Sequence, residues 1–173
     1  MQSDELRALQ APLKAQYREQ PESSLYTLTA RGTLDLEQIA CRIDTRDERI
    51  VAGLHRATGG DGSLLCSGDM LLEALVACAG VTLASVATAI SLPIAHGTIS
   101  AEGDLDFRGT LGVSRDVPVG FRDIRLHFDL QTDASDEQVA KLIQLTERYC
   151  VVFQTLNTRP NLSVTHGITN DSN

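Results

Sequence analysis

The segment from Ala74 to Ala95 contains no charged residue, and this feature limits what the chain can fold into more than any other. A helix that crosses a membrane needs about 20 apolar residues, and the segment is long enough for one. Its many small residues and its hydroxyl groups, such as Thr82, make it only weakly hydrophobic, and no Lys or Arg anchors flank it. We therefore predict a helix from Asp69 that is buried inside a soluble fold and ends before Pro93, with a single membrane span as the alternative.

Stretches that are typical of β-strands lie on both sides of this helix. Apolar side chains recur at every second position in them, as expected for strands with one buried face. Three stretches precede the helix and two follow it: Leu25 to Leu34, Ile39 to Thr45, Arg49 to His55, Thr98 to Phe107 and Phe121 to Thr132.

A second helix is predicted to begin after Ser135, because Gln138 stands three residues later and completes a capping-box pattern. Apolar residues continue at spacings of three and four as far as Phe153, which places Cys150 on the buried face of this helix. A final strand from Asn161 to Ile168 gives the element order βββαββαβ. The fold class is therefore α+β.

The length of 173 residues favours one domain with one core. Residues 1–24 are predicted to form a helical extension, with Leu6, Leu9 and Leu13 on one face and a turn before Pro21. Residues 25–168 form the domain itself. Residues 169–173 are predicted to be a flexible tail.

The net charge of -8 argues against nucleic acid as a partner, because phosphate recognition needs clustered Lys and Arg. The first ten residues, MQSDELRALQ, carry acids and lack an apolar core, so we expect neither a signal nor a transit peptide and a cytoplasmic location. The glycine-rich stretch from Ala57 to Ser63 lacks the GK[ST] ending of a phosphate-binding loop. We interpret it as a flexible loop.

The four cysteines are Cys41, Cys66, Cys78 and Cys150. In a cytoplasmic chain they are expected to be reduced thiols or redox groups rather than a disulfide framework. None of them forms a CxxC pair, and the histidines show no ligand spacing, so we expect neither a metal site nor another cofactor. Cys41 alternates with apolar residues on its strand and is predicted to be a core residue.

The segment CSGDMLLEALVACAGVTLASVA resembles the central helix of the OsmC/Ohr family (osmotically inducible protein C and organic hydroperoxide resistance proteins). ERYCVVFQTL resembles the second cysteine helix of the same family, and the two motifs stand in the expected order. The resemblance implies an OsmC-like fold in an intertwined homodimer, with two sites at the subunit interface. It also implies thiol-based reduction of organic hydroperoxides, with an external dithiol as the reductant.

The resemblance also assigns roles to single residues. Cys78 corresponds to the thiol that attacks the peroxide, and Cys150 to the thiol that resolves the resulting sulfenic acid. Arg56 corresponds to the arginine before the glycine-rich loop, and a cation beside Cys78 would lower its pKa. Asp69 is the candidate for the acidic residue at the start of the helix.

Alternatives remain at several of these positions. Cys66 is a second candidate for the resolving thiol, and Arg31 or Arg42 could serve in place of Arg56. The family's acidic position, ten residues before the attacking cysteine, is Gly68, and Val151 stands where many members have proline. Both departures favour a second hypothesis, a dimeric protein without catalysis that binds a ligand in an apolar pocket at its interface.

Overall fold

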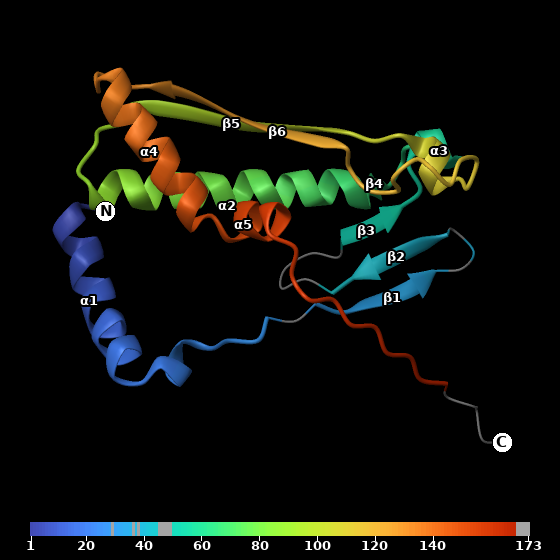
Figure 1. The fold of residues 1–173 in the computed structure, drawn as a ribbon, viewed down its shortest axis with the longest axis horizontal. Helices are drawn as coiled ribbons and strands as arrows, with labels where there is room; N and C mark the ends of the chain where they lie inside the picture. Colours follow the sequence, from blue (N-terminus) through green and yellow to red (C-terminus); the bar gives the residue numbers. More distant parts are fainter. Residues whose placement is uncertain (29, 36, 38, 45–49, 169–173) are drawn as a thin grey trace.

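The computed structural model describes residues 1–28, 30–35, 37, 39–44 and 50–168, and its fold is mixed α and β, as predicted. The long helix α2 (Ser67–Ala89) runs through the middle of the molecule (Figure 1). Strands β5 (His96–Asp104) and β6 (Asp123–Gln131) lie over one side of it, and helices α4 (Asp136–Tyr149) and α5 (Val151–Asn157) pack beside it. All four elements help to position the centre of α2.

Helix α2 begins two residues before the predicted start and ends ahead of Pro93, as expected. Beyond its last residue, Ser91 adopts a left-handed backbone with φ 55°, and the Leu92 N–H donates to Ala87 O at 2.9 Å. This turn closes the helix before the proline ring would clash with the preceding turn. The buried side chains of α2 are spaced by four residues and form one face: Leu75, Ala79, Leu83 and Ala87.

The β5–β6 hairpin supplies the layer that covers this buried face. The two strands are antiparallel, with Ile99 opposite Phe128 and Ala101 opposite Leu126. These apolar side chains pack against the core residues of α2, while the polar residues between them face outward. The alternation predicted from the sequence is confirmed, but β5 ends at Asp104 rather than Phe107, and Phe107 begins the short helix α3 (Phe107–Thr110).

A smaller sheet lies at the amino end of α2. Strands β1 (Gly32–Asp35), β2 (Ala40–Ile43) and β3 (Ile50–Gly53) form an antiparallel meander, and β4 (Leu65–Cys66) pairs with β3 in parallel. β4 leads directly into α2 and fixes where that helix begins. The first strand is shorter than predicted, because residues 25–28 are exposed and pair with no strand.

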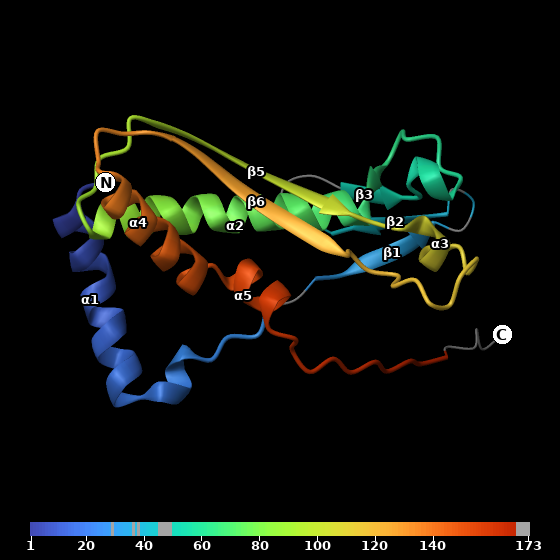
Figure 2. The same ribbon diagram turned by 45° about the horizontal axis from the view of Figure 1, so that its top comes forward.

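Helix α4 begins with the predicted capping box. The Ser135 side chain accepts from the Gln138 N–H at 3.3 Å, and the Gln138 side chain accepts from the Ser135 N–H at 2.9 Å. The prediction of one continuous helix to Phe153 is wrong. Cys150 has an extended backbone, with φ -72° and ψ 109°, so α4 ends there and α5 begins in a new direction (Figure 2).

The predicted last strand, Asn161 to Ile168, is also wrong for this chain. Residues 159–168 have no secondary structure, and the segment runs away from the body of the molecule (Figure 1). Leu162 and Val164 alternate with polar residues but are 85% and 94% exposed. A strand needs a neighbouring edge with which to exchange hydrogen bonds, and this segment has none within one chain. The order βββαββαβ is therefore not completed.

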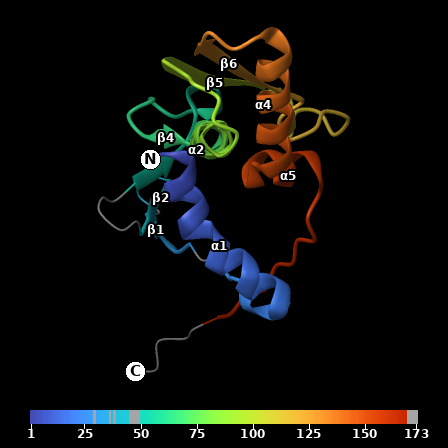
Figure 3. The ribbon, with the colours of Figure 1, turned by 90° about the vertical axis from the view of Figure 1, so that its left-hand side faces the viewer.

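The first residues form an arm outside this body. Helix α1 (Ser3–Glu19) has no buried residue and is followed by the short helix η1 (Pro21–Ser24). Figure 3 shows α1 descending from the carboxyl end of α2, while α4 and α5 stand on another side. The Ser3 hydroxyl donates to Ala89 O at 3.5 Å and links the arm to that end of α2.

One face of α2 stays uncovered within a single chain. Leu71 and Val81 are 37% and 73% exposed, and Ala74, Ala77 and Ala84 between and beyond them are exposed as well. By length and composition α2 is the one helix in the described part of the chain that could cross a membrane, and 22% of its most apolar stretch is buried. The central helix of a soluble protein meets the same criteria.

Candidate active site

Cys78 lies in the middle of α2 and is half-buried. Its side chain packs against the cluster formed by Leu75, Ala79 and Cys150. It stands between the covered face of α2 and the exposed apolar face described above, so the sulfur has both a packed surrounding and a route to solvent.

Cys150 is the residue at which α4 becomes α5, and it is completely buried. Its N–H donates to Thr146 O at 2.9 Å and closes α4, while its carbonyl accepts from the Gln154 N–H at 2.9 Å and opens α5. The first three N–H groups of α5 therefore have no partner within the helix. The break in the chain turns these donors toward the two thiols.

The two thiols interact directly, and their pKa values move in opposite directions. Burial raises the pKa of the Cys78 thiol, because it disfavours the charged form, but hydrogen bonds to the sulfur outweigh burial and leave the pKa below its ordinary value. The donors, in decreasing order of effect, are the Val152 N–H, the Cys150 side chain, the Val151 N–H and the Thr82 hydroxyl.

Burial is also the largest influence on Cys150, and it raises the pKa of this thiol. The neighbouring Cys78 raises it further, while the Phe153 and Val152 N–H groups act in the opposite direction. The more accessible thiol is thus the one that ionises more easily, and the fully buried thiol is the one that keeps its proton. An attacking cysteine must ionise and be accessible to the peroxide, and a resolving cysteine must lie beside it, so the two thiols suit these two roles.

Arg56 lies in the short helix η2 (Arg56–Thr58), between β3 and α2. Its charge contributes to lowering the pKa of Asp61, after the Ser63 hydrogen bonds to that carboxylate. No arginine is among the groups that shift the pKa of Cys78 in the described chain. One chain therefore does not bring Arg56 to the thiol, and its predicted role at the site stays a prediction.

Asp69 lies in the first turn of α2 and is exposed. It precedes Cys78 by nine residues, which corresponds to about 13 Å along a helix. It lines a shallow cavity of about 410 Å³ together with Glu73 and Ala101. Within one chain its carboxylate stabilises the amino end of the helix and does not reach the thiol pair.

Cys66 is the residue that precedes α2, and it is half-buried. Twelve residues separate it from Cys78, about 18 Å along the helix axis. It lines a cavity of about 320 Å³ with His55 and Phe107, whose rings stack at 4.7 Å. The structure thus brings Cys150, not Cys66, to Cys78. Cys41 lies in β2 and is half-buried, and it belongs to neither core cluster of the described residues, so its predicted core position is not confirmed.

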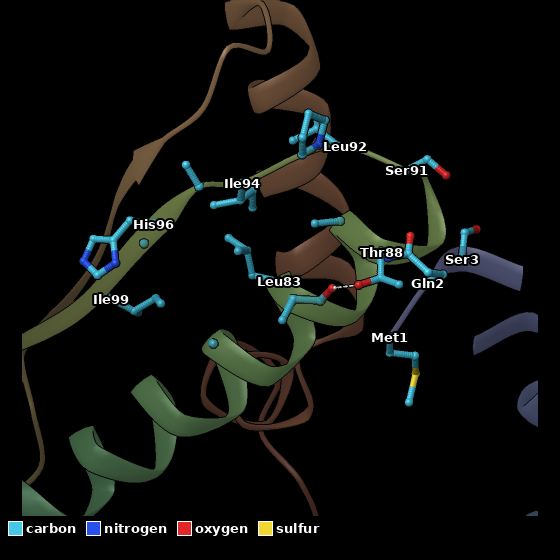
Figure 4. Close-up of a pocket in the computed structure, with 16 residues that line it drawn as sticks. Met1, Gln2, Ser3, Leu83, Thr88, Ser91, Leu92, Ile94, His96 and Ile99 are labelled. Atoms are coloured by element: carbon cyan, nitrogen blue, oxygen red, sulfur yellow. Dashed lines mark hydrogen bonds between the residues drawn. The ribbon is translucent and has the colours of Figure 1, made fainter. Parts of the chain in front are cut away.

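A larger cavity of about 720 Å³ lies elsewhere, between the first residues of the chain, the carboxyl half of α2 and the start of β5 (Figure 4). Leu83, Ile94 and His96 line it, and Thr88 on its wall donates to Ala84 O at 2.8 Å. No thiol lines this cavity. Among the described residues, no three His, Cys, Asp or Glu side chains are grouped so that they could hold a metal ion.

The model of the family described as OsmC-like protein matches residues 60–165, which include α2 and both cysteines of the pair. The chain belongs to the OsmC-like protein family. No curated protein matches the sequence. The family predicted from the two cysteine motifs is confirmed.

Solved structures of OsmC-like proteins share the fold. An OsmC-like protein from Mycoplasma pneumoniae superposes with a TM-score of 0.63 at 18% identity, over 78% of this chain and 89% of that one. An organic hydroperoxide resistance protein from Elizabethkingia anophelis gives 0.63 at 15% identity, over 79% and 91%. One from Bacillus subtilis gives 0.54 at 16% identity, over 76% and 93%.

Several residues of the site were not predicted from the sequence. Thr82 stands four residues after Cys78, and this spacing on one helix face could have identified it. The Val151 and Val152 N–H groups could not have been identified, because their role depends on the break at Cys150. Gly68 occupies the position of the family's acidic residue. A Cβ atom there would contact Phe121, so a side chain at this position would not point toward Cys78 and Cys150.

Proposed function

We propose that the chain reduces organic hydroperoxides, with Cys78 as the attacking thiol and Cys150 as the resolving thiol. The observation that carries this proposal is that Cys78 packs against the cluster that contains Cys150 at the start of α5, with the pKa values of the two thiols displaced in opposite directions. Membership of the OsmC-like family supports it, because several proteins of the same fold are organic hydroperoxide resistance proteins.

The reaction follows from the order in which the thiols ionise. The Cys78 thiolate attacks one oxygen of ROOH, the O–O bond breaks, and ROH leaves after taking up a proton. Cys78 then carries a sulfenic acid. The Cys150 sulfur attacks it, a disulfide forms, and water leaves. An external dithiol then supplies two electrons and two protons by thiol–disulfide exchange, which restores both thiols and suits a cytoplasmic location.

The surface beside Cys78 favours a peroxide with an alkyl group. Leu71, Ala74 and Val81 lie within two turns of it on the exposed face of α2, and none of them is charged. An alkyl chain gains free energy when it covers such a surface, about 25 cal/mol for each Å² buried. Hydrogen peroxide has no group that could use this contact.

We also propose that the working unit is a homodimer. The uncovered face of α2 is long and apolar, with acidic residues at its amino end, and a second copy would remove it from water except beside Cys78, where the alkyl group enters. A cation that assists Cys78 would then come from the partner subunit, because none acts on this thiol in the described part of one chain. Arg56 of the partner subunit is the first candidate.

One observation favours the alternative of a dimeric binding protein without catalysis. Among the described residues of one chain only hydrogen bonds lower the pKa of Cys78, with no positive charge acting on it, and the residue at position 68 is glycine. The two functions differ in what one equivalent of oxidant does. A binding protein would keep its thiols, and a peroxidase would lose a pair.

The test is a thiol count and an intact mass before and after one equivalent of tert-butyl hydroperoxide. We expect two thiols to disappear and the mass to fall by two hydrogens, with no added oxygen, and peptide mapping to join Cys78 to Cys150. Hydrogen peroxide at the same dose should react more slowly. An unchanged thiol count would support the binding protein instead.

A further inference from the structure

The arm formed by residues 3–28 carries an apolar surface that no described part of the chain covers. Leu9 and Leu13 of α1 are 60% and 47% exposed, and Leu6 lies on the same helix face. Leu25 and Leu28, after η1, are 80% and 92% exposed. The first residues of the arm touch the body of the chain at the carboxyl end of α2, and residues 1–59 lie outside the part that matches the family model.

The apolar face of α1 has a basic edge. Lys14 and Arg18 are one helical turn apart beside the leucines, and both are exposed. The exposed apolar face of α2 has the opposite edge: Asp69 and Glu73 are also one turn apart, and both are exposed. Among the described residues, none of these four side chains makes an ion pair.

The two surfaces do not meet in the described part of one chain. α1 leaves from the carboxyl end of α2, whereas Asp69 and Glu73 stand at its amino end, so the full length of α2 separates them (Figures 1 and 3). α2 has 23 residues and is therefore about 34 Å long. Complementary surfaces that one chain keeps apart can be joined by a second copy.

Two-fold symmetry brings them together. A two-fold axis that crosses the exposed face of α2 at a right angle makes the two copies of this helix antiparallel. The carboxyl end of one α2, where the arm is attached, then lies beside the amino end of the other. Because α1 is about 26 Å long, it can reach along the partner's α2 from there.

We propose that the arm packs across the amino half of α2 in a second copy of the chain, with Lys14 and Arg18 facing Asp69 and Glu73 of the partner subunit. This inference rests on the homodimer proposed above and gives a role to an arm that lies outside the part matched by the family model. Each subunit would give one arm and receive one, so both apolar surfaces would be buried at the same time.

Charge reversal tests the proposed pairing in the full-length chain. The double variant Lys14→Glu, Arg18→Glu should weaken the dimer at least about fivefold in sedimentation equilibrium at low salt. Adding Glu73→Lys to it should restore part of the loss. The matched control is Lys141→Glu, Arg148→Glu on α4, which changes the net charge equally and should leave the dimer constant unchanged.

The leucines test the apolar part of the contact. Leu9→Glu, Leu13→Glu should weaken the dimer by roughly tenfold or more, while Ala8→Glu, on the opposite face of α1 and away from Lys14 and Arg18, should have no effect. Circular dichroism of both variants shows that α1 has kept its helix. If every arm variant dimerises with the same dissociation constant as the wild type, the inference about the arm is wrong and the homodimer stands. If the unmodified chain is a monomer at micromolar concentration, both fail, and the thiol count still decides the peroxidase.

Discussion

Cys66 and Cys78 are twelve residues apart, but Cys66 ends strand β4 just before α2, whereas Cys78 lies in the middle of that helix. Cys66 precedes the first turn of α2, beside the stacked rings of His55 and Phe107. Cys78 lies at the centre, where a second thiol and the free N–H groups of α5 meet its sulfur. Cys78 is therefore a candidate nucleophile because a second element, α5, places hydrogen-bond donors and a second thiol beside its sulfur, whereas Cys66 has no such neighbours among the described residues.

The largest expected difference between the two cysteines is in turnover. Cys78→Ser should lower the rate of hydroperoxide reduction with an excess dithiol by at least about a hundredfold, because no other thiol can make the first attack. Cys66→Ser should keep close to the full rate, because Cys66 lies about 18 Å from Cys78 along the helix axis. If Cys78→Ser and Cys66→Ser both lost activity, the proposed difference in role between the two cysteines would be wrong.

Cys150→Ser sharpens the comparison, because it keeps the attacking thiol and removes the thiol that resolves it. The variant should consume about one equivalent of hydroperoxide per chain and then stall, with one oxygen added to Cys78 in the intact mass. Continued turnover at the wild-type rate would show that another thiol, Cys66 first among them, reaches the sulfenic acid.

Val151→Pro tests whether the N–H groups at the start of α5 lower the pKa of Cys78. Proline removes the N–H that donates to the Cys78 sulfur, yet it is tolerated as the first residue of a helix and requires the extended backbone that Cys150 already has. Alkylation of Cys78 at pH 7 should slow roughly threefold to tenfold, because the pKa of the thiol rises. Val151→Ala keeps the N–H and should leave the rate unchanged.

Arg56→Ala should have the smallest effect in a test on the thiol alone. In one chain this arginine acts on Asp61, but in the proposed homodimer Arg56 of the partner subunit is the first candidate for the cation beside Cys78, so its loss should displace the alkylation profile of Cys78 to higher pH. An unchanged profile would remove Arg56 of the partner subunit from the site.

The sequence predicted the elements whose signals are local. The uncharged run of α2, the alternation of β5 and β6 and the capping box of Ser135 and Gln138 each depend on neighbouring residues, and each is confirmed. The two cysteine motifs were enough to identify the family. The candidate thiols could therefore be named before any geometry was available.

The features that the sequence did not predict depend on distant parts of the molecule. The apolar spacing continues through Cys150 without glycine or proline, so nothing local indicates the break between α4 and α5. Leu162 and Val164 alternate as strand residues do, but a strand also requires an edge that one chain does not offer. The amide donors at Cys78 follow from that break and could not be found without it.

The most direct test of the account is the rate of Cys78 alkylation as a function of pH in the reduced protein, measured peptide by peptide, with the same thiol in the urea-denatured chain as the reference. The thiolate reacts and the thiol does not, so the rate rises as pH passes through the pKa. Because the pKa of Cys78 is lowered in the folded chain, its profile should lie at lower pH than in the denatured chain. Coincident profiles would show that neither α5 nor Cys150 activates this thiol, and they would contradict the proposed mechanism at its first step.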